Sequence, residues 1–439
     1  MMQMSEGLAD RSFAQRSRAA GSGRDGHALI GVYADRACAA LVGSLVSVTG
    51  HKLVADYRPV VTAQVMVPDH LREIFSAGPK LLSAFGERGV AQYATFVRET
   101  SLLQVDLIRG LCRAASIPVD DVLAVGLLGP GYWFPTADAG RSYLEFCDPS
   151  HVAEACGCNV LSHFPQRDIA AGGLGGPLQA VPQWFLLGQE ETSRLLLDVG
   201  RSVRLTFLPR GRSEEALDQI VAFDVGPGTA LLDELSLRLS EGRMRYDPGG
   251  TLAVQGKKIQ ELIDRWLAEP YFREPPPRWQ PDGVCAEQAL ESTVRMAVDA
   301  GWSIRDLLCT ATHFIARCVA QAVAAHVPGG IGRIDELLVG GGGQGNGMLL
   351  AEIRLQLRQL PLMRLVDLGL QAGELEAAST AVLAGMHLDR ISTCRPAITG
   401  VNLPRVAGQL TAGSPAGWSR LIRYMQHLAP THLSLRNAV

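Results

Sequence analysis

The chain has 439 residues, of which 47% are hydrophobic and 19% are charged, and its formal net charge is −3. This length is sufficient for two α/β domains with separate cores. Such a charge leaves no basic stripe for a nucleic acid, so the composition excludes that partner and favours a protein that acts on small molecules.

The first 27 residues combine arginine with serine, glycine and alanine, and they include no apolar run long enough for a signal peptide. We expect a disordered leader there. No window of the sequence is expected to span a membrane, because polar residues interrupt the apolar runs every few positions. These features predict a cytoplasmic protein without a membrane contact.

Ordered structure is expected from residue 28, where hydrophobic periodicity begins to separate strands from helices. The expected strands are 28–33, 38–50, 52–61, 122–128, 194–200, 203–208, 220–226 and 336–343, the last of which runs into glycines. The expected helices are 82–115, 257–268, 286–300, 304–325 and 376–388. A strand meander leading into a helix occurs twice in this order, which predicts two α/β lobes of related design.

The order of elements also sets the predicted bounds of the lobes. Lobe I is predicted to comprise residues 28–190 and 374–410, and lobe II residues 191–373. Residues 411–439 are predicted to form a C-terminal tail. An amphipathic piece of the tail, 418–428, has no role that the sequence indicates. The segment 270–283 is expected to be a surface loop, because its prolines lack an amide proton and clash in helices.

Nine cysteines are scattered along the chain, an odd number without the spacing of a disulfide scaffold or zinc ribbon. A reducing cytoplasm fits this usage. Cys156 and Cys158 are the one close pair, and no second pair of ligands lies nearby in the sequence. We therefore interpret them as small buried residues near a strand start, and the sequence identifies no set of metal ligands.

Glycines follow the strand that ends near residue 226, at the kind of position where backbone amides and a helix N-terminus cradle phosphate. Gly226 and Gly228 permit a ligand to approach the backbone closely, and Pro227 stiffens the turn. Asp224 lies at the strand end, where a carboxylate can hold a metal–phosphate complex. The alternative interpretation is a purely structural turn.

Two further segments contain several glycines at positions that could bind a ligand or support catalysis. Four successive glycines at 340–343 remove every Cβ from one stretch of backbone, so this stretch suits a nucleotide base or ribose; a flexible turn is the alternative. In segment 166–178, Arg167 and Asp168 precede two glycine pairs. A carboxylate beside a glycine loop suits a general base, whereas a helix cap or a surface charge is the alternative.

The three segments, in this order, resemble those of the bacterial anhydro-N-acetylmuramic acid kinases. The corresponding family patterns are Arg-Asp-Met-Ala-Ala-Gly-Gly-x-Gly-Ala-Pro-Leu, Asp-Thr-Gly-Pro-Gly-Asn and Cys-Gly-Gly-Gly. Further matches lie at 147–157, 246–256, 270–277, 373–384 and 395–400. The resemblance extends over about residues 120–400. It implies a two-lobed fold of the acetate kinase/Hsp70/actin type, which is ribonuclease H-like, with a cleft between the lobes.

This resemblance implies an activity in peptidoglycan recycling. An enzyme of this family uses ATP and Mg²⁺, opens the 1,6-anhydro ring of the amino sugar with water, and phosphorylates O6. By position, Asp168 is implied to activate the water. The sugar is implied to bind lobe I, with contacts to Arg167, Asp148, Gly172 and Gly173. ATP is implied to bind lobe II, with contacts to Asp224, Gly226, Pro227, Gly228, Gly341, Gly342 and Gly343. The family also implies a homodimer.

Several contact loops depart from the family pattern. The family's Met-Ser-Gly-Thr-Ser-x-Asp-Gly hairpin, which wraps the ATP phosphates, corresponds here to segment 31–42, which keeps Asp35 but lacks the internal glycines and hydroxyls. Gly-Ser-His-Gly-Gln-Thr becomes GLLGPGY at 126–132. Gly-Gly-Ile-Ala-Asn becomes GRSVR, which introduces Arg201 and Arg204.

These departures leave two alternatives to an active kinase. One is a pseudokinase that binds a sugar or nucleotide, or serves as a partner module. The other is a hydrolase in which Asp168 activates water at an anhydro or glycosidic bond without phosphoryl transfer.

Overall fold

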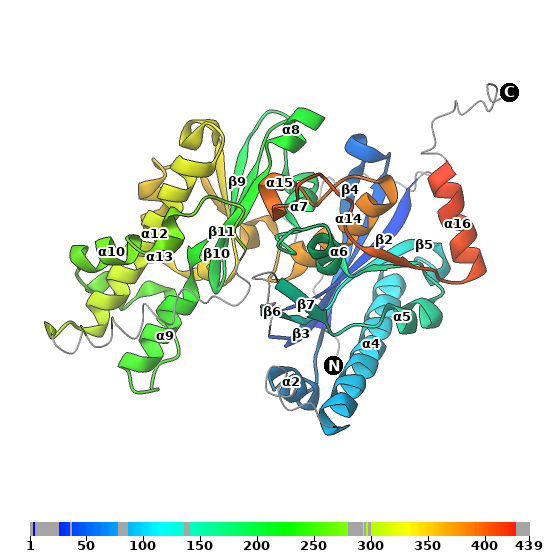
Figure 1. The fold of residues 1–439 in the computed structure, drawn as a ribbon, viewed down its shortest axis with the longest axis horizontal. Helices are drawn as coiled ribbons and strands as arrows, with labels where there is room; N and C mark the ends of the chain where they lie inside the picture. Colours follow the sequence, from blue (N-terminus) through cyan, green and yellow to red (C-terminus); the bar gives the residue numbers. More distant parts are fainter. Residues whose placement is uncertain are drawn as a thin grey trace. The chain divides into compact units, whose positions relative to one another are not determined.

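The computed structural model describes residues 3–4, 26–35, 37–77, 87–135, 141–279, 293, 296 and 300–426. The chain divides into two compact units (Figure 1). Unit 1 comprises residues 1–175, 373–394 and 401–439, and unit 2 comprises residues 176–372 and 395–400. Most of the expected leader and most of the expected helix 286–300 lie outside the described residues.

A seven-stranded sheet forms the centre of unit 1, in the order β1-β4-β3-β2-β5-β8-β14. Its strands are β1 (Gln3–Met4), β2 (His27–Ala34), β3 (Ala40–Thr49), β4 (Asp56–Met66), β5 (Val122–Leu128), β8 (Val160–Ser162) and β14 (Gln409–Thr411). β3 is antiparallel to both β2 and β4, whereas β5 is parallel to both β2 and β8. A separate hairpin pairs β6 (Gly131–Pro135) with β7 (Arg141–Glu145).

Helices pack on both faces of this sheet. They are α2 (Asp69–Ser76), α4 (Glu87–Ala115), α5 (Pro149–Cys156), α6 (Phe164–Ala170), α14 (Glu374–Asp389) and α16 (Pro415–Gln426). A Cβ on Gly43 would lie 2.8 Å from Leu111 of α4, whereas one on Gly31 would overlap the carbonyl oxygen of Ala377 in α14. Gly43 pairs with Val32, the neighbour of Gly31, so α4 and α14 lie on opposite faces.

Unit 2 contains a five-stranded sheet in the order β11-β10-β9-β12-β13. Its strands are β9 (Arg194–Val199), β10 (Ser202–Leu208), β11 (Val221–Pro227), β12 (Glu336–Gly340) and β13 (Leu362–Arg364). Its helices are α7 (Ala180–Leu187), α8 (Glu214–Asp218), α9 (Thr229–Leu239), α10 (Gln260–Leu267), α12 (Ile304–His326), α13 (Gly347–Gln356) and α15 (Pro396–Thr399). β10 is antiparallel to β9 and β11, whereas β12 is parallel to β9 and β13.

Short 3-10 helices connect several of these elements. They are η1 (Lys52–Val54), η2 (Val119–Asp121), η3 (Pro248–Gly250), η4 (Ala253–Gln255), η5 (Pro270–Arg273), η6 (Gly330–Arg333), η7 (Gly342–Gly345) and η8 (Leu365–Leu368).

The main strands of the two sheets follow one topology. In each unit the spatial order is third, second, first, fourth and fifth along the chain, and the second strand is antiparallel to the other four. This is the ribonuclease H-like arrangement. Its presence in both units confirms the predicted α/β fold of the acetate kinase/Hsp70/actin type.

The structure corrects the expectation that no segment is apolar enough to cross a membrane. α12 meets that criterion by length and composition, with 23 residues. However, 72% of its apolar window is buried inside the protein, where Leu308, Phe314 and Val319 join the core of unit 2. The apolar character of α12 is therefore that of a core helix.

Two segments differ from their expected placement. α7 belongs to unit 2, where the indole of Trp184 donates to the Pro209 carbonyl oxygen at 2.8 Å, and not to the lobe that precedes residue 190. The proline-rich segment contains η5, and Arg278 is buried. The Arg278 carbonyl oxygen accepts a hydrogen bond from the Asp224 amide at 2.9 Å, so this part of the segment lies against the sheet and is not a surface loop.

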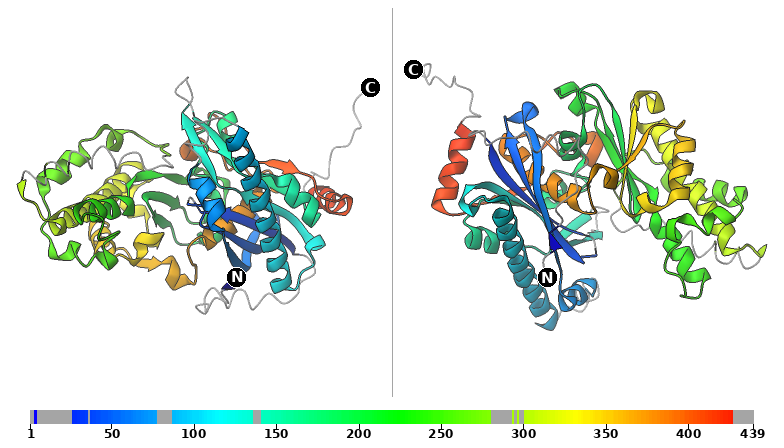
Figure 2. Two further views of the ribbon diagram at one scale, coloured as in Figure 1. Left: turned by 90° about the horizontal axis from the view of Figure 1, so that it is seen from below. Right: turned by 180° about the vertical axis from the view of Figure 1, so that it is seen from behind.

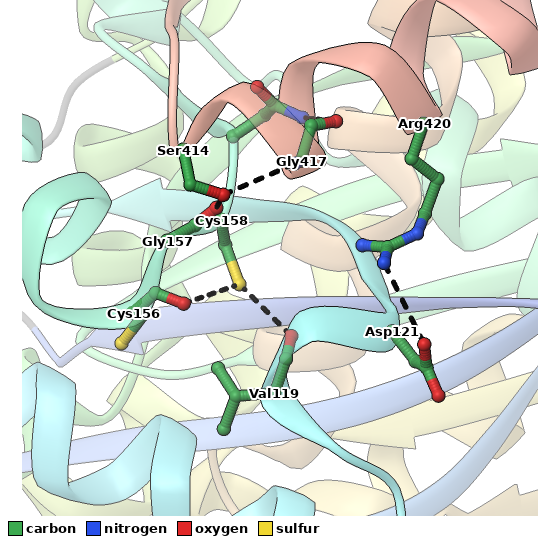
Figure 3. A network of polar contacts seen from close by, with 9 residues as sticks. Val119, Asp121, Cys156, Gly157, Cys158, Ser414, Gly417 and Arg420 are labelled. Carbon is green, nitrogen blue, oxygen red and sulfur yellow. Dashed lines mark hydrogen bonds and ion pairs between the residues drawn. The ribbon is translucent and has the colours of Figure 1, made fainter.

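The segment after residue 411 packs on unit 1 (Figure 3). The amide and hydroxyl of Ser414 both donate to the Gly157 carbonyl oxygen, at 3.0 and 3.1 Å, and Arg420 pairs with Asp121 at 3.7 Å. α16, for which the sequence indicates no role, is thereby attached beside β5 and η2, and its position at one end of unit 1 is visible in both views of Figure 2.

The C-x-C pair lies in the same network. Cys156 and Cys158 are both buried, and the Cys158 thiol donates to the carbonyl oxygens of Val119 and Cys156 at 3.4 and 3.5 Å (Figure 3). Burial raises the pKa of the Cys158 thiol to about 12, so the sulfur is protonated at neutral pH. The pair is therefore structural, and no group of three or more metal-ligating side chains occurs in the described part of the chain.

The close packing of α14 on the sheet predicts that a single added methyl group at Gly31 lowers the stability of the protein strongly. Gly31→Ala would place a Cβ against the backbone of Ala377 and Ala381, which cannot rotate away. We expect a loss of about 3 kcal/mol in the free energy of unfolding, measured by urea titration. Gly332→Ala is the matched control, because no atom lies within 4 Å of its Cβ position, and equal losses for the two variants would contradict this packing.

Candidate functional site

Asp168 lies on α6 in unit 1, and its side chain is completely buried. One oxygen of its carboxylate, Oδ2, accepts a hydrogen bond from the Gly175 amide at 2.7 Å. The Cys394 thiol also donates to this carboxylate, and burial together with the negative charge of Asp168 raises the pKa of that thiol. The Asp168 carboxylate therefore accepts hydrogen bonds from two separate segments: the glycine loop after α6 and the segment that follows α14.

The glycine loop after α6 is shaped around this carboxylate. A Cβ on Gly173 would overlap Oδ2 of Asp168, so no larger residue fits there without displacing the acid. The amides of Ala171 and Gly173 donate to the Asp168 carbonyl oxygen at 3.0 and 2.9 Å. At Gly172, φ is +88° and no atom lies within 4 Å of the Cβ position, so this backbone is open on its outer side.

The other two residues predicted to contact the sugar have different environments. Arg167 is exposed. The pKa of the nearby His387 ring is lowered mainly by burial, and the positive charges of Arg167 and Arg390 lower it further. Asp148 is the N-cap of α5 and accepts a hydrogen bond from the Ser150 amide at 2.9 Å. Asp148 therefore has a structural task whether or not it binds a ligand.

A second acid near α6, Glu145, has no sequence motif of its own. It ends β7 and is buried, and its carboxylate accepts hydrogen bonds from the Gly129 amide at 2.9 Å and from the Gln166 amide group at 3.2 Å. Burial raises the pKa of this carboxyl to about 7, although these hydrogen bonds lower it. Glu145 thus joins Gly129, in the turn between β5 and β6, to α6, the helix that contains Asp168.

In unit 2, the predicted phosphate segments meet at one edge of the sheet. β9, β11 and β12 run in the same direction, so their carboxyl ends lie together. Asp198, Asp224 and Gly341 lie at these ends, and a Cβ on Gly341 would lie 2.6 Å from the Asp198 carboxylate. Asp198 was not among the predicted site residues. The signal that could have revealed it is the sequence Asp-Val-Gly, which occurs both at 198–200, where β9 ends, and at 224–226 in β11.

The segment around Pro227 has most of its amides already paired. The amides of Gly228 and Ala230 donate to the Arg201 carbonyl oxygen at 2.8 and 3.3 Å, and the Thr229 amide donates to that of Gly200 at 2.8 Å. A Cβ on Gly228 would overlap the Gly200 carbonyl oxygen. At Gly226, the Cβ position lies 2.8 Å from the Phe272 ring. Packing alone therefore accounts for both glycines.

The four glycines at 340–343, the first of which ends β12, have two kinds of environment. Gly341 has φ of +74°, and a Cβ on Gly343 would overlap Val199, so packing on β9 requires both residues to be glycine. At Gly342, in contrast, nothing lies within 4 Å of the Cβ position. The open backbone at Gly342 and the N-terminus of α13, capped by Asn346, are the parts of this segment that a ligand can approach.

Arg204 connects the two aspartates of this edge. Its Nε lies 3.4 Å from Oδ1 of Asp224, and its Nη1 lies 3.8 Å from Oδ2 of Asp198. The guanidinium carbon is 4.4 Å from the centre of the Trp279 ring, at cation–π distance. Two carboxylates that suit a divalent cation are thus already paired with a fixed positive charge.

The N-terminal turn that replaces the family's phosphate hairpin is held by its own aspartate. The Asp35 carboxylate accepts hydrogen bonds from the Ala39 amide at 2.6 Å and from the Ala40 amide at 3.4 Å. Arg36 lies outside the described residues. Asp35 therefore stabilises the turn between β2 and β3, and these two amides donate within the turn.

Comparison with known proteins assigns a family to this arrangement. The family model for anhydro-N-acetylmuramic acid kinase matches residues 42–413, so the match starts where the divergent segment 31–42 ends. The anhydro-N-acetylmuramic acid kinase of Nitrosospira multiformis is 30% identical over 364 residues, which are 82% of this chain and 94% of that protein. The protein of the same name from Synechococcus elongatus is 34% identical over 262 residues, 60% of this chain and 68% of that protein.

Solved structures that resemble the chain include an ROK hexokinase from Thermus thermophilus. It is 15% identical with a TM-score of 0.34, and the match covers 81% of this chain and 97% of that one. Component A of the (R)-2-hydroxyglutaryl-CoA dehydratase from Acidaminococcus fermentans is 12% identical with a TM-score of 0.36, and the match covers 82% and 99% of the two chains. These scores are low, so the fold assignment rests on the strand order of the two sheets.

The buried acid Glu145 predicts a pH dependence of stability. Below about pH 4.5 the carboxyl is protonated in the folded and the unfolded chain, and between there and about pH 7 only the folded chain keeps its proton. Stability therefore falls as pH rises through this window and then stays low. Glu145→Gln removes this cost, so the variant should gain about 3 kcal/mol over the wild type at about pH 8 and little near pH 4.5.

Urea titrations at a series of pH values measure this difference. Glu154→Gln on α5 makes the same chemical change at an exposed position and should show no such trend. A gain for Glu145→Gln that does not vary with pH would contradict the raised pKa.

Proposed function

This chain belongs to the anhydro-N-acetylmuramic acid kinase family, and we propose that it is a sugar kinase that uses ATP to phosphorylate the 1,6-anhydro amino sugar of that name. In the proposed reaction, water adds to C1 of the sugar while the bond from C1 to O6 breaks. O6 then takes the γ-phosphoryl group, and ADP leaves. The reaction belongs to peptidoglycan recycling.

Asp168 carries this proposal. Its carboxylate is buried, bound by the Gly175 amide at 2.7 Å, and fitted against Gly173, where no side chain has room. A general base must be positioned within hydrogen-bond reach of its water, and these contacts fix the carboxylate at the glycine loop. We assign Asp168 the role of taking the proton from the attacking water. The exposed Arg167 and the open backbone at Gly172 support a sugar subsite beside it, together with Gly173 and Asp148.

ATP is proposed to bind unit 2. Asp224, Gly226, Pro227 and Gly228 are assigned to the phosphates, and Gly341, Gly342 and Gly343 to the adenosine. The convergence of these segments at the carboxyl ends of β9, β11 and β12 supports the assignment. Because the amides at the start of α9 are paired with the preceding hairpin, phosphate binding here depends on the helix dipole and on side-chain charge more than on free N–H groups.

The family implies Mg²⁺, and the residues of unit 2 do not fit it well. The two carboxylates at this edge, those of Asp198 and Asp224, are paired with Arg204, and no larger cluster of ligating side chains occurs in the described residues. No step of the proposed reaction is therefore assigned to a metal ion.

A cytoplasmic location and a homodimer are also part of the proposal. The eight cysteines that the structure describes are all free and buried, as expected in a reducing compartment. The dimer is inferred from the family resemblance.

A phosphoryl-transfer assay with γ-labelled ATP and 1,6-anhydro-N-acetylmuramic acid tests the reaction and its base together. We expect Asp168→Asn to lower kcat by 10²- to 10⁴-fold, on the order that general base catalysis contributes, with little change in KM for ATP. Asp106→Asn makes the same chemical change at an exposed position of α4 and should leave the rate unchanged.

The same assay separates the alternatives. Equal rates for the wild type and Asp168→Asn would remove Asp168 from the mechanism. Sugar binding, seen as a thermal shift, without any transfer from ATP would support the pseudokinase. Ring opening without ATP that is lost in Asp168→Asn would support the hydrolase.

A further inference from the structure

Three charged residues form a row across the sheet of unit 2. Arg204 on β10 pairs in register with Asp198 on β9 and with Asp224 on β11. Residues that lie directly opposite each other in antiparallel strands project from the same face, so the guanidinium has a carboxylate on each side. The positively charged Arg204 therefore lies between the two negatively charged residues Asp198 and Asp224, at the edge of the sheet where the predicted phosphate segments meet.

Burial makes this row hard to rearrange. The Asp224 side chain is 1% exposed, that of Arg204 is 14% exposed, and that of Asp198 is 32% exposed. Trp279 stacks on the guanidinium at 4.4 Å, and the chain next to it is fixed because the Arg278 carbonyl oxygen accepts from the Asp224 amide. Arg204 is thus packed from several sides.

The net charge of Asp198, Arg204 and Asp224 indicates whether this row can bind a metal ion. Without Arg204, two neighbouring carboxylates would carry a charge of −2 at a phosphate site, the arrangement that holds a hydrated divalent cation. With Arg204 the row carries −1, and its centre is filled by a group that is always protonated and cannot be displaced by water. Among the described residues, no third ligating side chain joins these two carboxylates to form a group that could hold a metal ion.

We propose that Arg204 takes the place of a divalent cation in unit 2: its guanidinium lies between the carboxylates of Asp198 and Asp224 and occupies the position that a metal ion would otherwise take, so these carboxylates do not bind one. This inference deepens the proposed nucleotide site. It assigns to Arg204 the positive charge that faces the phosphates, and it separates this chain from the motif it resembles, in which the position of Arg204 is asparagine.

Binding of Mn²⁺ alone to the full chain tests the proposal, followed by electron paramagnetic resonance of the free ion. The wild type should show only the weak, non-specific Mn²⁺ binding of exposed carboxylates, and none at this edge. Arg204→Asn exposes the two carboxylates to each other and should bind Mn²⁺ about tenfold or more tightly than the wild type does. Asp224→Asn added to that variant should remove the gain.

Two further variants serve as controls. Arg201→Asn removes an equal positive charge from an exposed position of the same β9–β10 hairpin. The described ion pairs of Asp198 and Asp224 are with Arg204 and not with Arg201, so this variant should bind Mn²⁺ as weakly as the wild type. Arg204→Met keeps an apolar stem against Trp279. It should acquire the metal site even if Arg204→Asn does not fold, as judged by circular dichroism.

Two results would overturn the proposal. One is Mn²⁺ binding by the wild type as tight as that of the Arg204 variants. The other is a folded Arg204→Asn or Arg204→Met protein that gains no affinity. Since neither readout uses the sugar or phosphoryl transfer, a failure of the proposed kinase reaction would leave this result interpretable.

Discussion

The central strand of each unit constrains everything around it. β2 and β9 each have an antiparallel hairpin on one edge and a parallel strand on the other, so their backbone groups are bonded on both sides. This arrangement brings the carboxyl ends of the first, third and fourth strands to one edge of the sheet. In unit 2, those ends hold Asp198, Asp224 and the glycine segment after β12, which are residues far apart in sequence. The position of the proposed phosphate site is thus a property of the topology.

Much of the fold was predictable because it depends on local patterns. The two meanders, α12 and α14 have continuous hydrophobic periodicity, and the order of elements indicated two lobes of one design. The expectation that no segment is apolar enough to cross a membrane was wrong for α12, because a core helix can be as apolar as a membrane-spanning one. The placement of α7 was missed because nothing local shows which sheet the chain will join.

The contacts within the candidate site were predictable only in part. The sequence indicated that Asp168 lies beside its glycine loop, because both belong to one segment, and its role as a base stays a prediction. Arg204 was noticed as a departure, but its partners on β9 and β11 depend on strand register, which sequence spacing does not show. Glu145 has an ordinary sequence context, and its raised pKa results from burial in the folded protein, which the local sequence does not show. Gly226 and Gly228 resembled ligand contacts, whereas steric fit to Phe272 and to Gly200 already requires glycine at both positions.

Unit 1 is assembled from segments at both ends of the chain, with residues 176–372 inserted between them. α14, which packs on β2 and β5 through Gly31 and Gly126, is translated only after that insertion. During synthesis on the ribosome, the face of the first sheet that α14 covers therefore stays open until α14 ends at Asp389, when nearly nine-tenths of the 439 residues have been made, whereas the main part of unit 2 emerges as one continuous stretch. The nascent first domain has to avoid aggregation for that interval, and its completion waits on a helix encoded near the end of the gene.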